Sequence, residues 1–264
     1  MNGGGGVLFN DRPTMEAIVE IGAAHRRFGT TGFLPTLISD DLDKVDAAMR
    51  AVEQAIDAGA PGVVGIHLEG PFLSAARKGV HGPSKFRRLD ATAIASLSSL
   101  RAGKTLVTPA PEECEIADIM TLAAAGVIVA AGHSNATYCQ MVGAFAAGVT
   151  GVTHLYNAMS PFRHRAPGVV GAALENRSVY CGIIPDGRHV DPAAMRIAVN
   201  VRPRDWFMLV TSMRGLKMRQ TKARLTPLVR AATSDSCASC DHSHDKPRAL
   251  RCRHTHPPSA SARA

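Results

Sequence analysis

The sequence has no long hydrophobic run, no signal-peptide pattern and few aromatic residues. Among its 264 residues there is no stretch of about 18 uncharged apolar residues, which argues against a membrane-spanning helix. The first residues, MNGGGGVLFNDRP, lack the basic and apolar regions of a secretory signal, so we expect a cytoplasmic protein. This glycine-rich start also lacks the GxGxxG context and the Walker lysine of a phosphate-binding loop.

Cysteine is also scarce, with six residues in the whole chain. Cys114, Cys139 and Cys181 are isolated from one another, so we expect buried thiols and no disulfide framework. The other cysteines lie in CASCDHSH and in the CRHTH that follows it. These segments have the residue types of a zinc knuckle but no apolar residue to form a core around the metal, so we expect no zinc site there.

The excess positive charge is confined to the C-terminal region. Residues 1–211 contain 19 basic and 19 acidic residues, whereas residues 212–264 contain 11 basic residues and three acids. The C-terminal region has no glutamate and no glycine after Gly215, and Arg, Ser, Ala, His, Thr and Pro dominate it. We therefore expect one folded body, residues 1–211, followed by a disordered basic tail, residues 212–264.

The body alternates helical patterns with short apolar runs, which is typical of an α/β fold. Seven runs predict strands at 32–38, 62–70, 105–110, 127–134, 151–158, 179–187 and 206–211. In five of them, polar or ionisable residues follow at the carboxyl end of the run. Parallel barrels build active sites from many strand ends, whereas a doubly wound sheet gathers them at one switch point. We therefore predict a TIM-type (β/α)8 barrel.

Three of these strand ends carry metal-ligand residue types. Glu69, His133 and His154 follow three different predicted strands, and such positions converge near the axis of a barrel. One carboxylate and two imidazoles suit a single divalent zinc or iron ion and leave positions open for water, as in catalytic sites. Each histidine alone is better explained as a hydrogen-bonded residue at a strand end, but the three together favour a metal site.

Six motifs carry a more specific signal: HLEGPF, KGVHG, AGHSNAT, THLYNAM, PGVVGAAL and PDGRHV. In this order and spacing, the segment from Asn2 to about Thr211 resembles the N-acetylglucosamine-6-phosphate deacetylase family of the amidohydrolase superfamily. The resemblance implies a metal-dependent hydrolase of a linear amide, which removes acetate from N-acetylglucosamine 6-phosphate in amino-sugar catabolism. It also implies a homodimer with shared sites.

The resemblance assigns roles to individual residues. Glu69, His133 and His154 match the family's metal ligands. His81 matches the histidine that contacts the acetamido carbonyl, where a donor stabilises the developing oxyanion. The other implied substrate contacts are Asn157, Ala158, His189 and Arg165, of which Arg165 reaches the phosphate across a dimer interface. Without the resemblance, His81 and Arg165 are equally well explained as solvated loop residues.

The chain departs from the family pattern at both ends. The family has a small β domain and a first barrel strand ahead of the glycine-rich segment, so we expect an incomplete barrel without strand 1. The family's last barrel strand ends in Val-Thr-Asp-Ala, and that aspartate is the general acid/base, whereas here Ser212 follows Thr211. A hydroxyl cannot cycle a proton near neutral pH, which predicts weak or no activity. A shifted reading frame in a gene of high G+C content would explain both this loss and the tail.

Two other functions remain open at this stage. A non-enzymatic remnant could bind metal or sugar phosphate, or nucleic acid through its basic tail. We do not expect nucleic acid, because stacking aromatic residues and a recognised motif are lacking. A dihydroorotase-like or deaminase-like enzyme is disfavoured, because those enzymes usually carry a His-x-His pair on the first strand.

Overall fold

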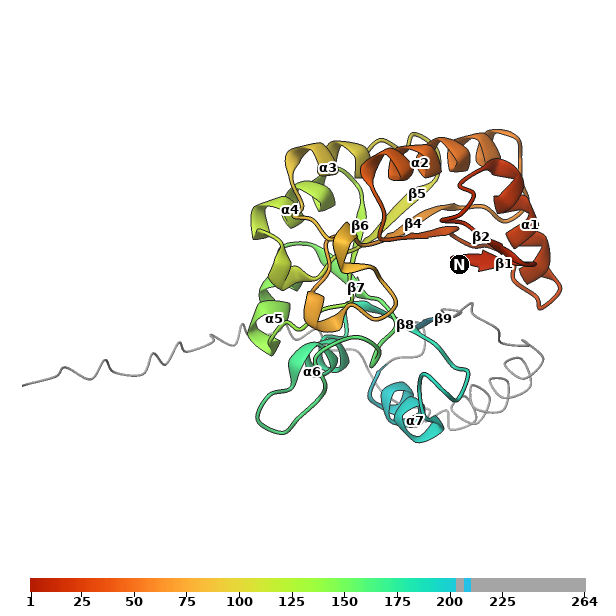
Figure 1. The fold of residues 1–264 in the computed structure, drawn as a ribbon. Coiled ribbons are helices and arrows are strands. Elements are labelled where there is room, and N and C mark those ends of the chain that lie inside the picture. The colour runs from red at the N-terminus through yellow and green to blue at the C-terminus, as the bar shows by residue number, and fades with distance from the viewer. Residues whose placement is uncertain (203–206, 210–264) are drawn as a thin grey trace, which may run out of the picture.

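The central feature of the computed structural model is a curled parallel sheet of seven strands in the order β3-β4-β5-β6-β7-β8-β9 (Figure 1). The structure describes residues 1–202 and 207–209. Every neighbouring pair in this sheet is parallel. The strands are β3 (Thr36–Ile38), β4 (Gly65–Glu69), β5 (Lys104–Thr108), β6 (Ile128–Ala131), β7 (Val149–Val152), β8 (Tyr180–Ile183) and β9 (Phe207–Leu209).

Helices connect the strands and lie in an arc outside the sheet (Figure 1). The α-helices are α1 (Met15–Arg26), α2 (Leu42–Asp57), α3 (Ala91–Leu97), α4 (Ile116–Ala124), α5 (Tyr138–Ala146), α6 (Gly168–Glu175) and α7 (Pro192–Val201). Short 3-10 turns are η1 (Ala75–Arg77), η2 (Pro83–Lys85) and η3 (Pro111–Glu113). Strands in sequential order with helices on one side form part of a (β/α) barrel, which confirms the predicted fold class.

All seven predicted strand regions overlap a strand of the sheet, but most extend beyond it, and the prediction for 151–158 is wrong after its first two residues. Strand β7 begins at Val149 and ends at Val152. The residues that follow turn sharply, because His154, Tyr156 and Ala158 have φ angles of 40°, 77° and 48°. Left-handed residues cannot continue a strand. The polar residues of THLYNAM therefore lie in a loop beyond the strand end.

A hairpin that was not predicted precedes the barrel strands. Strands β1 (Gly3–Gly4) and β2 (Val7–Leu8) pair antiparallel. The two residues between them, Gly5 and Gly6, have φ angles of 64° and 90°. Positive φ at both central residues is what a tight two-residue hairpin of this kind requires, and glycine adopts it without strain. The glycine-rich start thus serves as a turn.

Strand β4 shows how the sequence separates the core from the interior of the barrel. Ile66 and Leu68 are fully buried and belong to the hydrophobic core between sheet and helices. Because side chains alternate along a strand, His67 and Glu69 point to the opposite face, which is the concave side of the curled sheet. The same strand therefore supplies the core with one set of residues and the barrel interior with the other.

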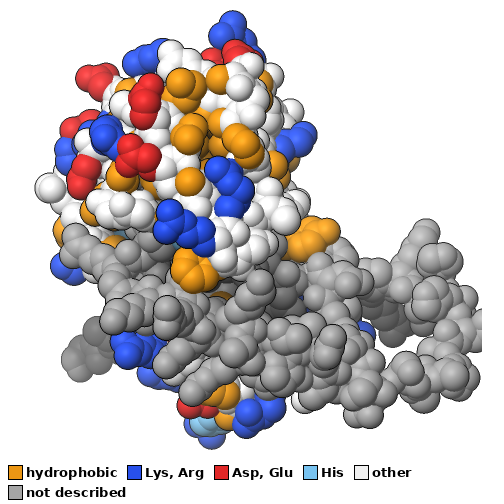
Figure 2. All heavy atoms as spheres, turned by 90° about the vertical axis from the view of Figure 1, so that its right-hand side faces the viewer, with side chains coloured by type: hydrophobic (Ala, Val, Ile, Leu, Met, Phe, Trp, Pro, Cys, Tyr) orange, Lys and Arg blue, Asp and Glu red, His pale blue; other side chains and the backbone are white. Residues whose placement is uncertain are grey.

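The surface and the cysteines of the described residues agree with most of the sequence analysis. On the face shown in Figure 2, basic and acidic side chains are interspersed with hydrophobic ones. No disulfide joins Cys114, Cys139 and Cys181. Cys181 is buried as predicted and Cys114 is half-buried, but the prediction is wrong for Cys139, which is exposed on α5. Across residues 1–202 and 207–209, no helix is long and apolar enough to cross a membrane. The cysteine-containing tail lies outside the described residues.

Candidate metal centre

Three polar atoms from three strand ends meet on the concave side of the sheet. Glu69 is the last residue of β4, while His133 and His154 each lie two residues beyond the ends of β6 and β7. The Glu69 Oε1 atom lies 3.1 Å from His133 Nε2 and 2.9 Å from His154 Nε2. The two Nε2 atoms are 3.0 Å apart, and both histidines are buried. The sequence prediction that these residues converge agrees with this geometry.

Backbone carbonyls fix the orientation of both imidazoles. His133 Nδ1 lies 2.8 Å from the Arg77 carbonyl oxygen, and His154 Nδ1 lies 3.1 Å from that of Asn157. A carbonyl only accepts hydrogen bonds, so each Nδ1 carries a proton and each neutral ring turns its Nε2 lone pair towards Glu69. Two lone pairs and a carboxylate oxygen directed at one another repel unless a positive charge lies between them. This donor set therefore fits a divalent cation.

The spacing of the three atoms also suits one ion. Ligands bound about 2.0–2.1 Å from Zn²⁺ in a tetrahedral site lie about 3.3 Å from one another. The three distances here, 2.9–3.1 Å, are close to that value. His81 lies near the same point, because one possible ligand atom from each of Glu69, His81 and His133 lies within 4.8 Å of the other two.

The electrostatics of the site also favour positive charge beside Glu69. With no metal bound, an imidazole that carries a second proton on Nε2 can donate to Glu69 Oε1. Burial would raise the pKa of Glu69, but such hydrogen bonds from His133 and His154 hold that pKa well below its usual range. Burial would lower the pKa of His154, but the hydrogen bond and charge of Glu69 outweigh it, and the pKa is raised. The site thus keeps its carboxylate ionised in the absence of metal, which is the state a metal ligand needs.

His81 reaches the centre from the long loop after β4 and is suited to donate a hydrogen bond. Its Nδ1 accepts from the backbone N–H of Ser39 at 3.3 Å and lies 2.7 Å from Ser39 Oγ. Since Nδ1 accepts, the neutral ring carries its proton on Nε2, which is then a donor and has no lone pair for a metal. Burial, followed by the nearby charge of His133, lowers the pKa of His81 to about 4, so the ring is neutral at pH 7. We therefore place His81 beside the metal ligands as a donor.

Two residues that sequence reasoning missed hold this arrangement. Ser39, directly after β3, orients His81, as described above. Glu112, in η3 after β5, accepts from Ser134 Oγ at 2.6 Å and from the Asn135 backbone N–H, and so fixes the loop that carries His133. Glu112 follows a predicted strand, which is the signal that identified Glu69, so it could have been found. A serine after a strand is too common to be singled out.

Backbone strain is concentrated in the same loops. His133 has a φ angle of 48°, in the left-handed region that non-glycine residues rarely adopt. Its carbonyl accepts from the Ser74 N–H at 3.0 Å, and the next residue, Ser134, donates its N–H to Ala158 at 3.1 Å. Such strain persists where surrounding contacts over-determine it, which is typical of functional sites.

The predicted substrate contacts lie around the centre in different ways. Asn157 and Ala158 are half-buried in the turn that follows His154. His189 is exposed in the loop after β8, where its Nδ1 lies 2.6 Å from Asp186 Oδ2. Asp186 also accepts the backbone N–H groups of Arg188 and His189, so it fixes the imidazole that the sequence assigned to substrate.

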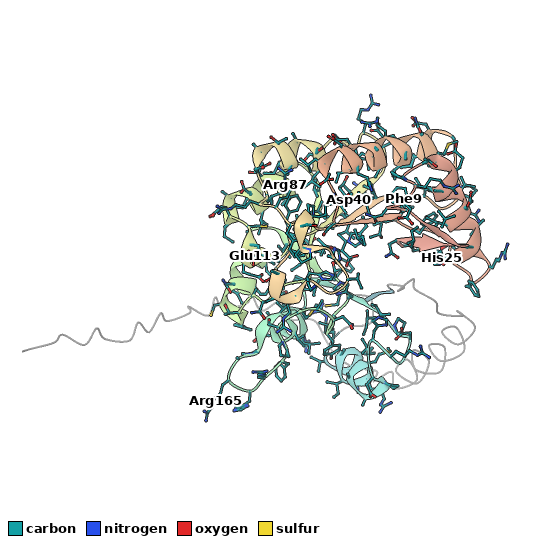
Figure 3. All side chains as sticks on the ribbon, in the orientation of Figure 1. Phe9, His25, Asp40, Arg87, Glu113 and Arg165 are labelled. Atoms are coloured by element: carbon teal, nitrogen blue, oxygen red, sulfur yellow. The ribbon has the colours of Figure 1, made fainter. Side chains whose placement is uncertain are left out.

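One predicted site residue, Arg165, is not part of this cluster. Arg165 is exposed near the end of the loop between β7 and α6, which projects away from the sheet (Figure 3). The structure therefore does not bring Arg165 to the metal ligands of its own chain. Ser212 lies outside the described residues.

Comparisons with known proteins point to one group of enzymes. No protein-family model matches the chain. The chain is 44% identical over 223 residues to an N-acetylgalactosamine-6-phosphate deacetylase from a Shewanella species, covering 84% of this chain and 57% of the relative. It is 37% identical over 203 residues to the N-acetylglucosamine-6-phosphate deacetylase of Haemophilus influenzae, covering 76% of this chain and 53% of the relative.

Solved structures agree with the curated relatives. The crystal structure of N-acetylglucosamine-6-phosphate deacetylase from Pasteurella multocida has a TM-score of 0.76 and 35% identity, covering 80% of this chain and 55% of that one. A mutant of the Mycobacterium smegmatis enzyme, solved in complex with N-acetyl-D-glucosamine-6-phosphate, has a TM-score of 0.72 at 35% identity over the same shares. The chain thus spans somewhat over half the length of the proteins it matches.

Proposed function

This chain is a homologue of the amino-sugar-6-phosphate deacetylases over about four-fifths of its length, and we propose that it acts in the same way on an N-acetylated hexosamine 6-phosphate. The reaction is hydrolysis of the acetamide bond, which yields acetate and the free amino-sugar phosphate. The observation that carries the proposal is the convergence of Glu69, His133 and His154, with the donor His81 beside them.

The metal would be held by Glu69 Oε1 and the Nε2 atoms of His133 and His154. A divalent ion bound there supplies Lewis-acid polarisation of a carbonyl and lowers the pKa of water at the site. Zinc and iron both suit one carboxylate and two imidazoles, and we propose one of them as the native ion.

The protein's own residues supply the remaining chemistry. His81 donates its Nε2–H to the acetamide oxygen, which gains negative charge as the carbonyl carbon becomes tetrahedral. We propose Asn157 and the backbone at Ala158, in the turn next to His154, as hydrogen-bond partners of the sugar phosphate. His189, oriented by Asp186, is a further substrate contact from the neighbouring loop.

One catalytic function has no residue assigned to it. A water molecule that attacks an amide must lose a proton, and the amine that leaves must gain one. In this sequence Ser212 stands where the resemblance places an aspartate for that task. A binding protein with little turnover is therefore the second candidate, and the same metal centre would serve it.

The substrate class is broader than the sequence analysis expected. Both N-acetylgalactosamine-6-phosphate and N-acetylglucosamine-6-phosphate deacetylases are among the relatives. The two sugars differ only in the configuration of C4, which lies away from the acetamido group. The reacting centre described above serves either sugar equally, so we propose the class and leave the epimer to experiment.

We also propose a homodimer that acts in the cytoplasm, where sugar phosphates are made and used. The support for the dimer is the exposed position of Arg165 on a loop that points away from its own metal centre (Figure 3). A guanidinium there is free to bind the phosphate of a substrate held by a second copy, and its fork of donors suits phosphate well.

The test is acetate release, followed by NMR, from three sugars: the two N-acetylhexosamine 6-phosphates and unphosphorylated N-acetylglucosamine. We expect release from one or both phosphates, little from the unphosphorylated sugar, and none after removal of metal by a chelator. Dilution of the chain should lower the rate per chain, because a shared site is lost when dimers dissociate. A metal-loaded chain that releases no acetate even at equimolar substrate would contradict the enzyme and favour the binding protein.

A further inference from the structure

A second layer of polar side chains lies directly beneath the metal centre. It consists of Thr36 on β3, His67 on β4, Thr108 on β5 and Thr153 after β7, all buried, and we call it the polar layer. His67 Nδ1 lies 3.2 Å from Thr36 Oγ1, and His67 Nε2 lies 2.8 Å from Thr108 Oγ1. Thr108 Oγ1 lies 2.7 Å from Thr153 Oγ1. The layer therefore joins strands β3, β4, β5 and β7 by side-chain hydrogen bonds.

Both ring nitrogens of His67 have hydrogen-bond partners within this layer. Each has a threonine hydroxyl within hydrogen-bond distance, so neither is free to bind a metal. A hydroxyl has one proton to give, and Thr108 lies between His67 and Thr153, so it donates to at most one neighbour and accepts from the other. Each of the four side chains of the layer thus has a partner, and removal of one hydroxyl leaves a buried polar group without one.

Each metal ligand is next to a member of the layer or to a residue packed against it. His67 lies two residues before Glu69 on β4 and shares its face. Thr153 immediately precedes His154. Gly132 immediately precedes His133, and a Cβ atom at Gly132 would lie 2.7 Å from Thr108 Cγ2 and 3.0 Å from Thr153 Cβ. The absence of a side chain at Gly132 therefore lets Thr108 and Thr153 meet across β6.

We propose that the polar layer sets the spacing of the three metal-ligand atoms, and that Thr108 is its central positioning residue. The hydrogen bonds from His67 through Thr108 to Thr153 fix β4 relative to β7, two strands that are not neighbours in the sheet. Glu69 and His154 extend from these two strands, and their ligand atoms lie 2.9 Å apart. This inference rests on the metal site of the proposed function but concerns residues that would touch neither metal nor substrate.

The test compares Zn²⁺ affinity among purified variants of the full chain, by competition with a chromophoric chelator. Thr108→Val keeps the side-chain shape and removes the hydroxyl, and we expect it to bind Zn²⁺ about 10- to 100-fold more weakly. Thr108→Ser keeps the hydroxyl and should bind much as the unchanged chain does. Thr105→Val is the matched control, because Thr105 is buried on the opposite face of the same strand and should not alter the affinity.

Each outcome supports or overturns the inference. Weaker Zn²⁺ binding by Thr108→Val alone, in a metal-free variant that still unfolds cooperatively, supports positioning by the layer. Equal affinities for all three variants would overturn it while leaving the metal site intact. An unchanged chain that binds no Zn²⁺ would overturn the metal site itself. If Thr108→Val does not fold, Thr153→Val removes the last hydroxyl of the layer, leaves His67 bonded to Thr108, and should weaken Zn²⁺ binding in the same way.

Discussion

Replacing Ser212 with aspartate is expected to raise the rate of acetate release by about 100- to 10,000-fold, the usual contribution of a general acid/base. Strand β9 ends at Leu209. Ser212 comes three positions later in the sequence and lies outside the described residues. Residues after parallel barrel strands face the active site. A carboxylate there could take the proton of the attacking water and return it to the leaving amine, which a serine hydroxyl cannot do at neutral pH.

The measurement is kcat for Ser212→Asp against Ser212→Asn, both loaded with the same amount of metal. Asparagine matches aspartate in size and polarity but carries no titratable proton, so it should leave kcat at the level of the unchanged chain. If aspartate and asparagine gave the same rate, position 212 would not supply the proton transfer. The absence of an aspartate there would then not limit the chain's activity.

Replacing His81 with alanine in the Ser212→Asp background is expected to lower kcat by about 100- to 1,000-fold, which is typical for the loss of one oxyanion donor. The reason is that Ser39 occupies Nδ1 of His81, so the proton of the neutral ring is on Nε2 and is available to the oxyanion. Because the oxyanion forms only after attack, the loss should appear in kcat more than in KM. His81→Gln, which restores an N–H donor on a side chain of similar reach, should recover part of the rate.

The metal content of the His81→Ala variant distinguishes a hydrogen-bond donor at His81 from a metal ligand. His81 lies within 4.8 Å of ligand atoms on Glu69 and His133, close enough to be considered as a ligand itself. We expect His81→Ala to retain its metal, since His154 Nε2 is only 3.0 Å from His133 Nε2 and completes the set. Loss of the metal together with activity would instead make His81 a ligand.

The sequence predicted the barrel and the meeting of its strand ends for a physical reason. The carboxyl ends of parallel strands gather at one end of a barrel, so Glu69, His133 and His154 could be grouped without any coordinates. The strand prediction at 151–158 was wrong beyond Val152, because the apolar residue Leu155 extends the pattern while the backbone already turns at His154. Apolar periodicity does not reveal left-handed backbone.

The supporting contacts could not be predicted, because they join residues far apart in the chain. Ser39 and His81 are separated by 42 positions, and Thr108 and Thr153 by 45. Serine and threonine occur after many strands, so their residue type carries little information before the fold is known. Gly132 is a similar case: only the structure shows that two threonines occupy the space a side chain would need.

The most direct test of the metal centre is the metal content of the purified chain after dialysis against Zn²⁺, compared with Glu69→Gln. We expect one ion per unchanged chain. Glu69→Gln keeps the size and hydrogen-bonding reach of the side chain but removes the charge that the site holds ionised. Its affinity should fall by more than the roughly 10- to 100-fold that the loss of an outer partner costs. An unchanged chain without bound zinc, or a Glu69→Gln variant that binds zinc equally well, would contradict a metal site made by Glu69, His133 and His154.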